Sequence, residues 1–334
     1  MKWTVAACVL AKNMASRVSG LDRRAPLCRR RGGTPCERLR RSAALRSGTE
    51  AIMALWMVVA GFSGGCAVAA EPPLTVLILA GQSDILNWHA DAALLPADPA
   101  DSEIRFYYHT GAPPLHPQFP RNFFNATSAD AWTTLRPQTQ EPYHKFFHTF
   151  FGPEMTLGRR LHAAGVRPLA IIKIGYFGTN LAEDWRPDAT SGNQLYALFR
   201  RQVTNALARL RDERREFRVA GFFWMQGGGD GAKAAFAVRY EGNLAQLIER
   251  MRADFGTPGT PFVIGRIPHI ANAPHRETVR AAHVKLGTTL PGVAWINSDD
   301  LPCDTDGVHL LAPGIITLGE RMATAWLKLT GNRR

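Results

Sequence analysis

The sequence predicts one α/β domain in which a short parallel sheet carries helices on both faces, a doubly wound arrangement. Short apolar runs alternate along the chain with helix-length amphipathic segments, and strand–helix–strand units of this kind build parallel sheets through right-handed crossovers. Polar, glycine-containing motifs follow the ends of several apolar runs. Ligands of doubly wound sheets bind beyond the carboxyl ends of the strands, so these motifs mark the expected site.

The predicted strands and helices follow one another in a regular order. The first strand covers residues 74–80, an apolar run that ends at Gly81. Further buried strands are expected at residues 169–174, 219–224, 261–265 and 293–297. Helices are expected at residues 154–164, 194–216, 232–255, 276–289 and 313–330. These elements place the domain at residues 71–334.

Residues 85–151 interrupt the alternation and are predicted to be a long loop insertion. They are rich in proline, histidine and aromatic residues and show little amphipathic period. Ordered loops of this length usually line or cover an active site. The alternative is that the aromatic rings only form a small core beneath the loop.

Residues 1–70 are expected to lie outside the domain. Residues 1–50 carry most of the net charge of +12, so the basicity does not indicate nucleic-acid binding by the domain. Residues 1–52 are predicted to be a basic N-terminal extension and residues 53–70 a signal peptide, because an uncharged apolar run ends in small residues before Glu71. A signal anchor is the alternative, and Cys66 also fits a lipoprotein site. We therefore expect a secreted or periplasmic protein, in contact with a membrane only through this segment or a lipid anchor.

The number and position of the cysteines exclude some kinds of chemistry in the domain. Of the 5 cysteines in the chain, only Cys303 lies within residues 71–334. Neither a disulfide framework nor a thiol cluster for a metal is expected. The histidines show no H-E-x-x-H or comparable metal spacing, so neither a metal nor a cofactor is predicted.

A serine and an aspartate–histidine pair are the candidate catalytic residues. Ser83 follows the first predicted strand, and Asp306 and His309 follow the last. An aspartate three residues before a histidine can hold one imidazole nitrogen while the other faces a nucleophile. The motif alone is weak, because a surface loop before a helix also matches it. Its expected position at the same sheet edge as Ser83 favours hydrolase chemistry.

The ordered set of motifs resembles the sialate O-acetylesterase and acetylxylan esterase branch of the SGNH hydrolase superfamily. The resemblance covers essentially the whole domain and implies a flavodoxin-like SGNH fold and a serine hydrolase, a carbohydrate acetylesterase. The motifs are Gly81-Gln82-Ser83, Gly152-Pro153-Glu154-Met155, Gly178-Thr179-Asn180-Leu181 with Trp185, Trp224-Met225-Gln226-Gly227 with Asp230, and Asp306-Gly307-Val308-His309.

The resemblance also implies roles for individual residues. Ser83 would be the nucleophile, His309 the general base and Asp306 the carboxylate that orients the base. The oxyanion hole would consist of the backbone N–H groups of Ser83 and Gly178 and the side-chain amide of Gln226. The predicted substrate-binding residues are Gln82, Asp84, Thr179 and Asn180.

Three positions depart from the family pattern. Asp84 stands where relatives usually have asparagine, Gly228 where they have glutamate, and Phe177 where they have a second glycine. An ionised Asp84 would oppose the oxyanion while stabilising protonated His309. A further hypothesis is that Asp84 lies close to the residue at position 228 and takes over part of the hydrogen-bonding role of the missing glutamate.

These features predict a secreted carbohydrate O-acetylesterase whose partner is an acetylated carbohydrate. The alternative is a weakly active or inactive carbohydrate-binding protein on an esterase scaffold, because Asp84 and Gly228 alter the expected site. Sialic acid carries a carboxylate that an arginine would match, whereas xylan would need only aromatic platforms and neutral donors. The candidate arginines are Arg121, Arg136, Arg186 and Arg266.

Overall fold

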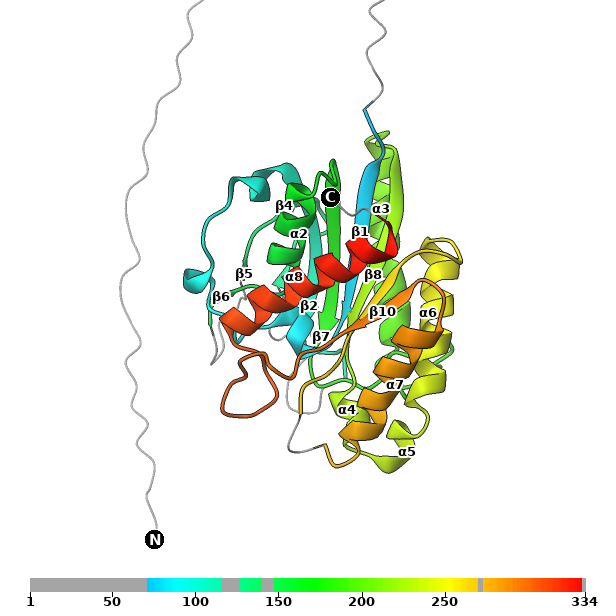
Figure 1. Ribbon diagram of the computed structural model, residues 1–334. Coiled ribbons are helices and arrows are strands. Elements are labelled where there is room, and N and C mark those ends of the chain that lie inside the picture. Colours follow the sequence, from blue (N-terminus) through cyan, green and yellow to red (C-terminus); the bar gives the residue numbers. More distant parts are fainter. Residues whose placement is uncertain (1–70, 116–125, 140–146, 270–272, 332–334) are drawn as a thin grey trace, which may run out of the picture. The chain divides into compact units, whose positions relative to one another are not determined.

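A central, mostly parallel sheet organises the computed structural model, which describes residues 71–115, 126–139, 147–269 and 273–331 (Figure 1). The predicted extension and signal peptide lie outside the described residues. Two short strands run antiparallel to the second parallel strand. The parallel strands are β1 (Leu74–Gly81), β2 (Ile104–Gly111), β7 (Leu169–Tyr176), β8 (Phe217–Met225), β9 (Phe262–Gly265) and β10 (Val293–Ile296), and the antiparallel ones are β3 (Ala126–Thr127) and β4 (Thr133–Thr134).

The strand order switches direction at β1. The order across the sheet is β10-β9-β8-β1-β7-β2-β3, with β4 also paired to β2. β1 pairs in parallel with β7 along one edge and with β8 along the other. The loops that follow β1, β7 and β8 therefore meet at the switch point, where doubly wound sheets bind ligands. This topology confirms the predicted fold class.

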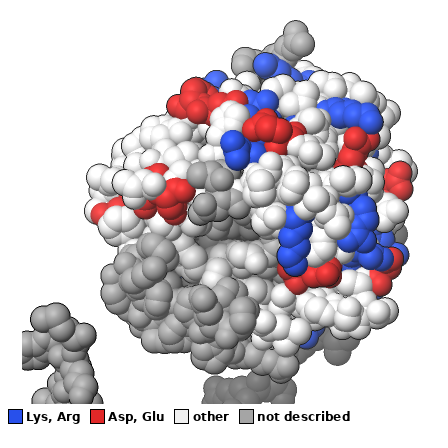
Figure 2. All heavy atoms as spheres, turned by 90° about the horizontal axis from the view of Figure 1, so that it is seen from below, with Lys and Arg blue, Asp and Glu red and all other residues white. Residues whose placement is uncertain are grey.

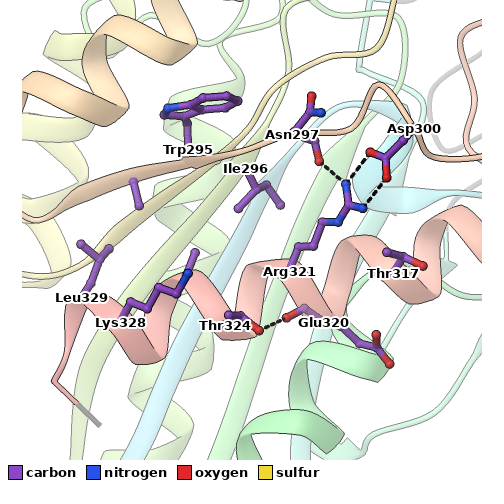
Figure 3. A pocket seen from close by; sticks show the side chains of 12 residues that line it. Trp295, Ile296, Asn297, Asp300, Thr317, Glu320, Arg321, Thr324, Lys328 and Leu329 are labelled. Atoms are coloured by element: carbon purple, nitrogen blue, oxygen red, sulfur yellow. Dashed lines mark hydrogen bonds and ion pairs between the residues drawn. The ribbon is translucent and has the colours of Figure 1, made fainter. Parts of the chain in front are cut away.

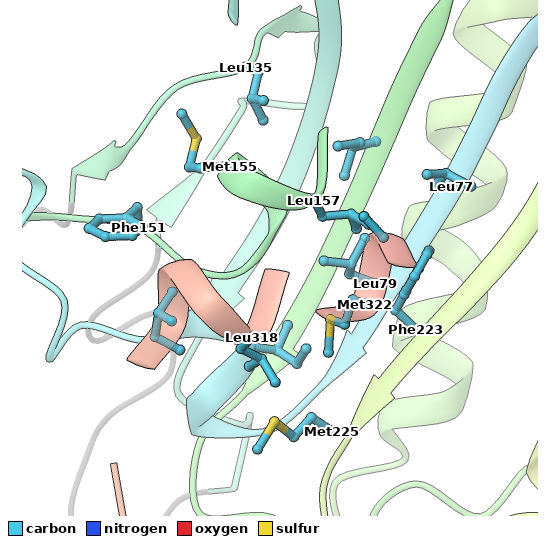
Figure 4. Close-up of a cluster of buried hydrophobic side chains, with 14 of the residues drawn as sticks. Leu77, Leu79, Leu135, Phe151, Met155, Leu157, Phe223, Met225, Leu318 and Met322 are labelled. Carbon is cyan, nitrogen blue, oxygen red and sulfur yellow. The ribbon is translucent and has the colours of Figure 1, made fainter. Parts of the chain in front are cut away.

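Helices cover both faces of the sheet (Figure 1). Leu77 and Leu79 of β1 belong to one core cluster, and Val76 and Ile78 to the other, because successive strand residues point to opposite faces. Figure 4 shows the first cluster, in which Leu77 and Leu79 lie with side chains of α8. On that face lie α2 (Glu154–Ala163) and α8 (Ala312–Leu329), and on the other α3 (Leu195–Asp212), α6 (Tyr240–Phe255) and α7 (Arg276–Thr289).

The prediction of a loop insertion over residues 85–151 is wrong for a substantial part of it. β2 is an eight-residue strand of the main sheet, and its partner β7 lies beside it in parallel register. Phe106, Tyr107 and Tyr108 are all buried, so the strand lacks an alternating pattern. The other described elements of this segment are short: η1 (Ala92–Leu94), η2 (Pro99–Glu103), β5 (Gln138–Thr139) and β6 (Thr149–Phe150).

The predicted helix over residues 232–255 is broken into shorter pieces. Within that range the structure has α5 (Ala234–Ala237) and the longer α6, with Val238 and Arg239 between them, and the separate short helix α4 (Gly228–Gly231) lies before it. Lys233 has φ −127° and ψ 126°, an extended conformation that separates α4 from α5. Within the described part of the chain, no helix is long and apolar enough to cross a membrane.

Candidate active site

The turn after β1 carries the predicted nucleophile. β1 ends at Gly81, and the short helix α1 (Ser83–Leu86) begins two residues later. Gly81 has φ +149°, and a Cβ atom there would lie 2.2 Å from the carbonyl oxygen of Met225 on β8. Only glycine permits this close approach of the two strand ends. The turn thereby places Ser83, whose side chain is buried, at the switch point of the sheet.

The predicted base and its carboxylate are joined by a short hydrogen bond. His309 Nδ1 donates to Asp306 Oδ2 over 2.6 Å. The other carboxylate oxygen accepts from the backbone N–H groups of Val308, at 2.8 Å, and His309, at 3.0 Å. Burial raises the pKa of Asp306, but these hydrogen bonds and the nearby His309 outweigh it and lower the pKa to about 2. Asp306 is therefore ionised at neutral pH and holds the proton of His309 on Nδ1.

Two side chains bind the loop of His309 to the turn of Ser83. Asp84 Oδ1 accepts from the backbone N–H of Leu310 at 3.2 Å, and Asn87 Nδ2 donates to the carbonyl oxygen of Leu310 at 2.9 Å. Both polar groups of the residue after His309 are thus held by residues one and four positions after Ser83. These two bonds hold the loop of His309 beside the turn of Ser83.

Asp84 lies beside the loop that carries His309. Burial raises its pKa to about 6, while the charge of His309 and the hydrogen bond from Leu310 lower it and the charge of Asp306 raises it. In the described residues, the carboxylate that bonds to Gln226 is Asp230, at 2.7 Å. The prediction that Asp84 replaces the glutamate missing after Gln226-Gly227 is therefore not supported by these contacts.

Two backbone N–H groups fit the predicted oxyanion hole. Within the described residues, neither the N–H of Ser83 nor that of Gly178 donates a hydrogen bond. Gly178 has φ +64° and is exposed, a conformation that favours glycine. Both groups lie in loops that follow neighbouring central strands, β1 and β7, so both remain the predicted donors to an oxyanion.

The side-chain amide of Gln226 does not fit the predicted role of oxyanion donor. Its Nε2 donates to the carbonyl oxygen of Thr179 at 3.1 Å and to Asp230 Oδ2 at 2.7 Å, and an amide nitrogen has only two hydrogens. Asp230 also accepts the backbone N–H groups of Leu181, at 2.8 Å, and Ala182, at 3.0 Å. The prediction for Gln226 is contradicted by this geometry, because the amide joins the loops after β7 and β8.

The side chains predicted to bind substrate have partners inside the protein. Gln82, Asp84 and Thr179 are buried, and each bonds to backbone or side-chain groups of the fold. Asn180 is partly exposed and donates from Nδ2 to Asp184 at 2.8 Å. The bonded groups of these side chains support the loops around the site, and their role in binding substrate stays a prediction.

A second histidine–aspartate pair was not predicted. His89 Nδ1 lies 2.9 Å from Asp304 Oδ2, and the His89 ring stacks on the His309 ring with centroids 4.2 Å apart and planes 6° from parallel. His89 is 6% exposed, so the pair is largely enclosed by the fold. Asp304 lies two residues before Asp306, but no sequence pattern connects it to position 89.

The same two histidines and Asp306 are of residue types that can bind a metal ion. Ligand atoms of His89, Asp306 and His309 lie within 4.8 Å of one another. A metal binds an imidazole nitrogen in the plane of its ring, so two rings stacked face to face do not direct their lone pairs at one ion. Each Nδ1 is also bonded to a carboxylate. We therefore assign these residues to hydrogen bonding and stacking.

A buried ion pair lies beneath the Ser83 turn and was also missed. Lys173 Nζ on β7 lies 2.9 Å from Glu154 Oε2, and both side chains are fully buried. Lys173 Nζ also donates to Gln138 Oε1 at 2.7 Å and to the carbonyl oxygen of Leu86, the last residue of α1, at 3.1 Å. Burial lowers the pKa of Lys173 and Glu154 raises it. Because the lysine uses all its donors, the network fixes the end of α1.

The surface around the strand ends carries both signs of charge. Figure 2 views the molecule from the end at which the parallel strands terminate, and its acidic and basic side chains are interspersed rather than separated into one field. A cavity of about 810 Å³ lies away from the Ser83 turn, between β10 and α8 (Figure 3). None of the predicted catalytic residues lines it, so we do not place the reaction there.

Comparisons with known proteins agree with this architecture. The family model described as carbohydrate esterase, sialic acid-specific acetylesterase matches residues 73–328. A solved protein from Arabidopsis thaliana has 19% identity and a TM-score of 0.54, over 77% of this chain and 99% of that chain. NanS has 16% identity and a TM-score of 0.55, over 78% of this chain and 98% of that chain. A carbohydrate acetylesterase from Xanthomonas citri has 19% identity and a TM-score of 0.52, over 78% of this chain and 57% of that chain. Comparison with the curated proteins gives no match.

Proposed function

Since this chain belongs to the carbohydrate esterase family of sialic acid-specific acetylesterases and is a carboxylic ester hydrolase, we propose that it removes acetyl groups from carbohydrates through a Ser-His-Asp mechanism. The observation that carries the mechanism is the bond between His309 and Asp306 on a loop that is itself bonded to the Ser83 turn. Such an arrangement supplies a nucleophile, a base and an orienting carboxylate.

In the proposed reaction, Ser83 Oγ attacks the acetyl carbonyl carbon while His309 Nε2 takes the serine proton. The backbone N–H groups of Ser83 and Gly178 stabilise the negative oxygen of the tetrahedral intermediate. The intermediate collapses to acetyl-Ser83, and His309 returns the proton to the departing sugar oxygen. Water, deprotonated by His309, then attacks the acetyl group and releases acetate.

The contacts of Asp84 support an active enzyme over an inactive binding protein. Its carboxylate is buried and accepts the N–H of Leu310, so it helps to hold the loop of the base. The bond between His309 and Asp306 is intact beside it. Asp84 therefore accompanies an intact His309–Asp306 pair, which supports the proposal that the loss of the family's asparagine leaves the chemistry in place.

The proposed substrate is an acetylated carbohydrate, and the contacts of the candidate arginines do not single out one sugar. Two of the arginines considered for a sialic acid carboxylate already have acidic partners: Arg186 bonds to Asp188, and Arg266 bonds to Asp299. Arg136 is exposed, and Arg121 lies outside the described residues. A substrate panel therefore needs both charged and neutral sugars.

The test measures acetate release from O-acetylated sialic acids, acetylated xylan and simple acetyl sugars. We expect the wild-type protein and a Ser102→Ala control, which removes an exposed hydroxyl that donates to the nearby carbonyl oxygen of Pro99, to release acetate at equal rates. Ser83→Ala should lower turnover by about 10⁴ or more. Equal binding of the sugars by wild type and Ser83→Ala with no acetate release by either would instead identify a carbohydrate-binding protein.

A further inference from the structure

The stacked rings of His89 and His309 follow from the shape of the loop that carries the base. Cys303 and Leu310 form an antiparallel bridge, and the N–H of Asp304 donates to the carbonyl oxygen of His309 at 2.7 Å. Asp304 and His309 are therefore opposite each other across a narrow hairpin, and side chains of such a pair lie on the same face. A histidine held by Asp304 is thereby brought beside the ring of His309.

Asp304 fixes the orientation of the His89 ring. One carboxylate oxygen lies 2.9 Å from His89 Nδ1, and the other accepts the backbone N–H of Thr305 at 2.6 Å. Since a carboxylate accepts, Nδ1 of His89 carries a hydrogen. Burial and then the charge of His309 lower the pKa of His89, against the opposing effects of Asp304 and Asp306. The ring is accordingly neutral at neutral pH.

We propose that His89 is a positioning residue for the proposed esterase reaction, and that its ring, held by Asp304, forms a flat support that keeps His309 in the orientation that serves Ser83. The inference rests on the proposed function. His309 has one ring nitrogen bonded to Asp306, which restrains the ring at one point and leaves rotation about that bond. A parallel ring at 4.2 Å restrains the plane itself.

The support also suits the charge that His309 acquires during the reaction. When His309 takes the serine proton, a neutral aromatic face beside it stabilises the cation. The groups that face His309 from the packed described segments are Asp306 on its own loop, Asp84 on α1, and His89 with Asp304. Misplacement of a catalytic group by about 1 Å can lower a rate by about 10², so loss of the support should slow the reaction itself.

The test compares His89→Ala with His89→Phe, which keeps a flat ring but loses the bond to Asp304. The control is His162→Ala: His162 is equally buried, at 6%, and its Nε2 bonds to Glu103, outside the site. Two readouts are used, the kcat and KM for an acetyl ester and the far-downfield proton resonance of the short His309 Nδ1–Asp306 hydrogen bond.

We expect His89→Ala to lower kcat by about 10–10² with KM changed less than about twofold, and to weaken or broaden the resonance. His89→Phe should restore most of both properties, and His162→Ala should leave both unchanged. An unchanged resonance and kcat in His89→Ala overturns the proposal, as does an equal loss in the Ala and Phe variants, which would assign the effect to the bond with Asp304. If no Ser83-dependent activity exists, the proposed function fails. The proton resonance of the His309–Asp306 hydrogen bond still shows in that case whether His89 holds the His309 ring.

Discussion

At the scale of single residues, Asp84 makes the fold sensitive to pH. Its pKa is raised from 3.8 to about 6, chiefly by burial, so the folded protein binds this proton more tightly than the unfolded chain does. The stabilisation that this group provides is complete below the unfolded pKa and is lost as the pH rises through about 6. Above that pH, the buried carboxylate destabilises the fold by on the order of 3 kcal/mol.

Replacing Asp84 by asparagine should therefore raise the free energy of unfolding near pH 8 by up to about 3 kcal/mol and change it little near pH 4. The asparagine oxygen can still accept the N–H of Leu310. Urea unfolding at both pH values measures the difference, with Asp188→Asn as an exposed control that should show no gain. A gain of the same size at both pH values would show that the carboxylate's ionisation is not the cause.

Asp306 is expected to act on turnover rather than on stability. Asp306→Asn keeps the size of the side chain but removes the charge that holds the hydrogen on His309 Nδ1, so the wrong tautomer is favoured and kcat should fall by up to about 10⁴. Steady-state kinetics on an acetyl ester checks this, with thermal unfolding as the control for folding. A variant with near-normal kcat would remove Asp306 from the mechanism.

The proposed catalytic residues could be predicted from the sequence, but most of the contacts around them could not. Ser83 and His309 follow predicted strands and match short motifs at characteristic spacing. Gln226 was misjudged because a motif fixes the residue type and not the direction of its amide hydrogens. His89 was missed because its partner lies 215 positions away, and only the folded chain brings the two together.

At the scale of elements, the ion pair between Lys173 on β7 and Glu154 joins the central sheet to α2, and Lys173 also bonds to the end of α1. Lys173→Met leaves the Glu154 carboxylate buried without its cation, and breaking such a pair costs about 3–5 kcal/mol. The double change of Lys173→Met with Glu154→Gln removes both charges and should recover a part of that loss. Urea unfolding of the two single variants and the double variant measures the coupling. Simple additivity of the single effects would contradict it.

The sequence predicted elements best where the hydrophobic pattern is regular. β1 and α7 lie at or within one residue of their expected bounds, because one is a continuous apolar run and the other an amphipathic helix. β2 was missed since its aromatic and polar residues resemble a loop until β7 is placed beside it. The start of α5 depends on the extended backbone of Lys233, which the local composition does not reveal.

At the scale of the whole molecule, the described domain begins where the predicted signal peptide ends. We propose that residues 53–70 direct export and are removed, because the apolar run ends in small residues before Glu71. The mass of protein recovered from the exported fraction of a bacterial host should then correspond to a chain that starts near Glu71. A retained apolar segment would identify a signal anchor, and a lipid adduct on Cys66 would identify a lipoprotein.

The central claim is that Ser83 is a nucleophile activated by His309 and Asp306, and intact-protein mass spectrometry with a fluorophosphonate tests it most directly. Such reagents form a stable bond with an activated serine. The wild-type protein should gain one adduct on Ser83, Ser83→Ala should gain none, and His309→Ala should react far more slowly. The Ser102→Ala control should react like the wild type. An adduct on another residue, or equal labelling of Ser83→Ala, would contradict the account.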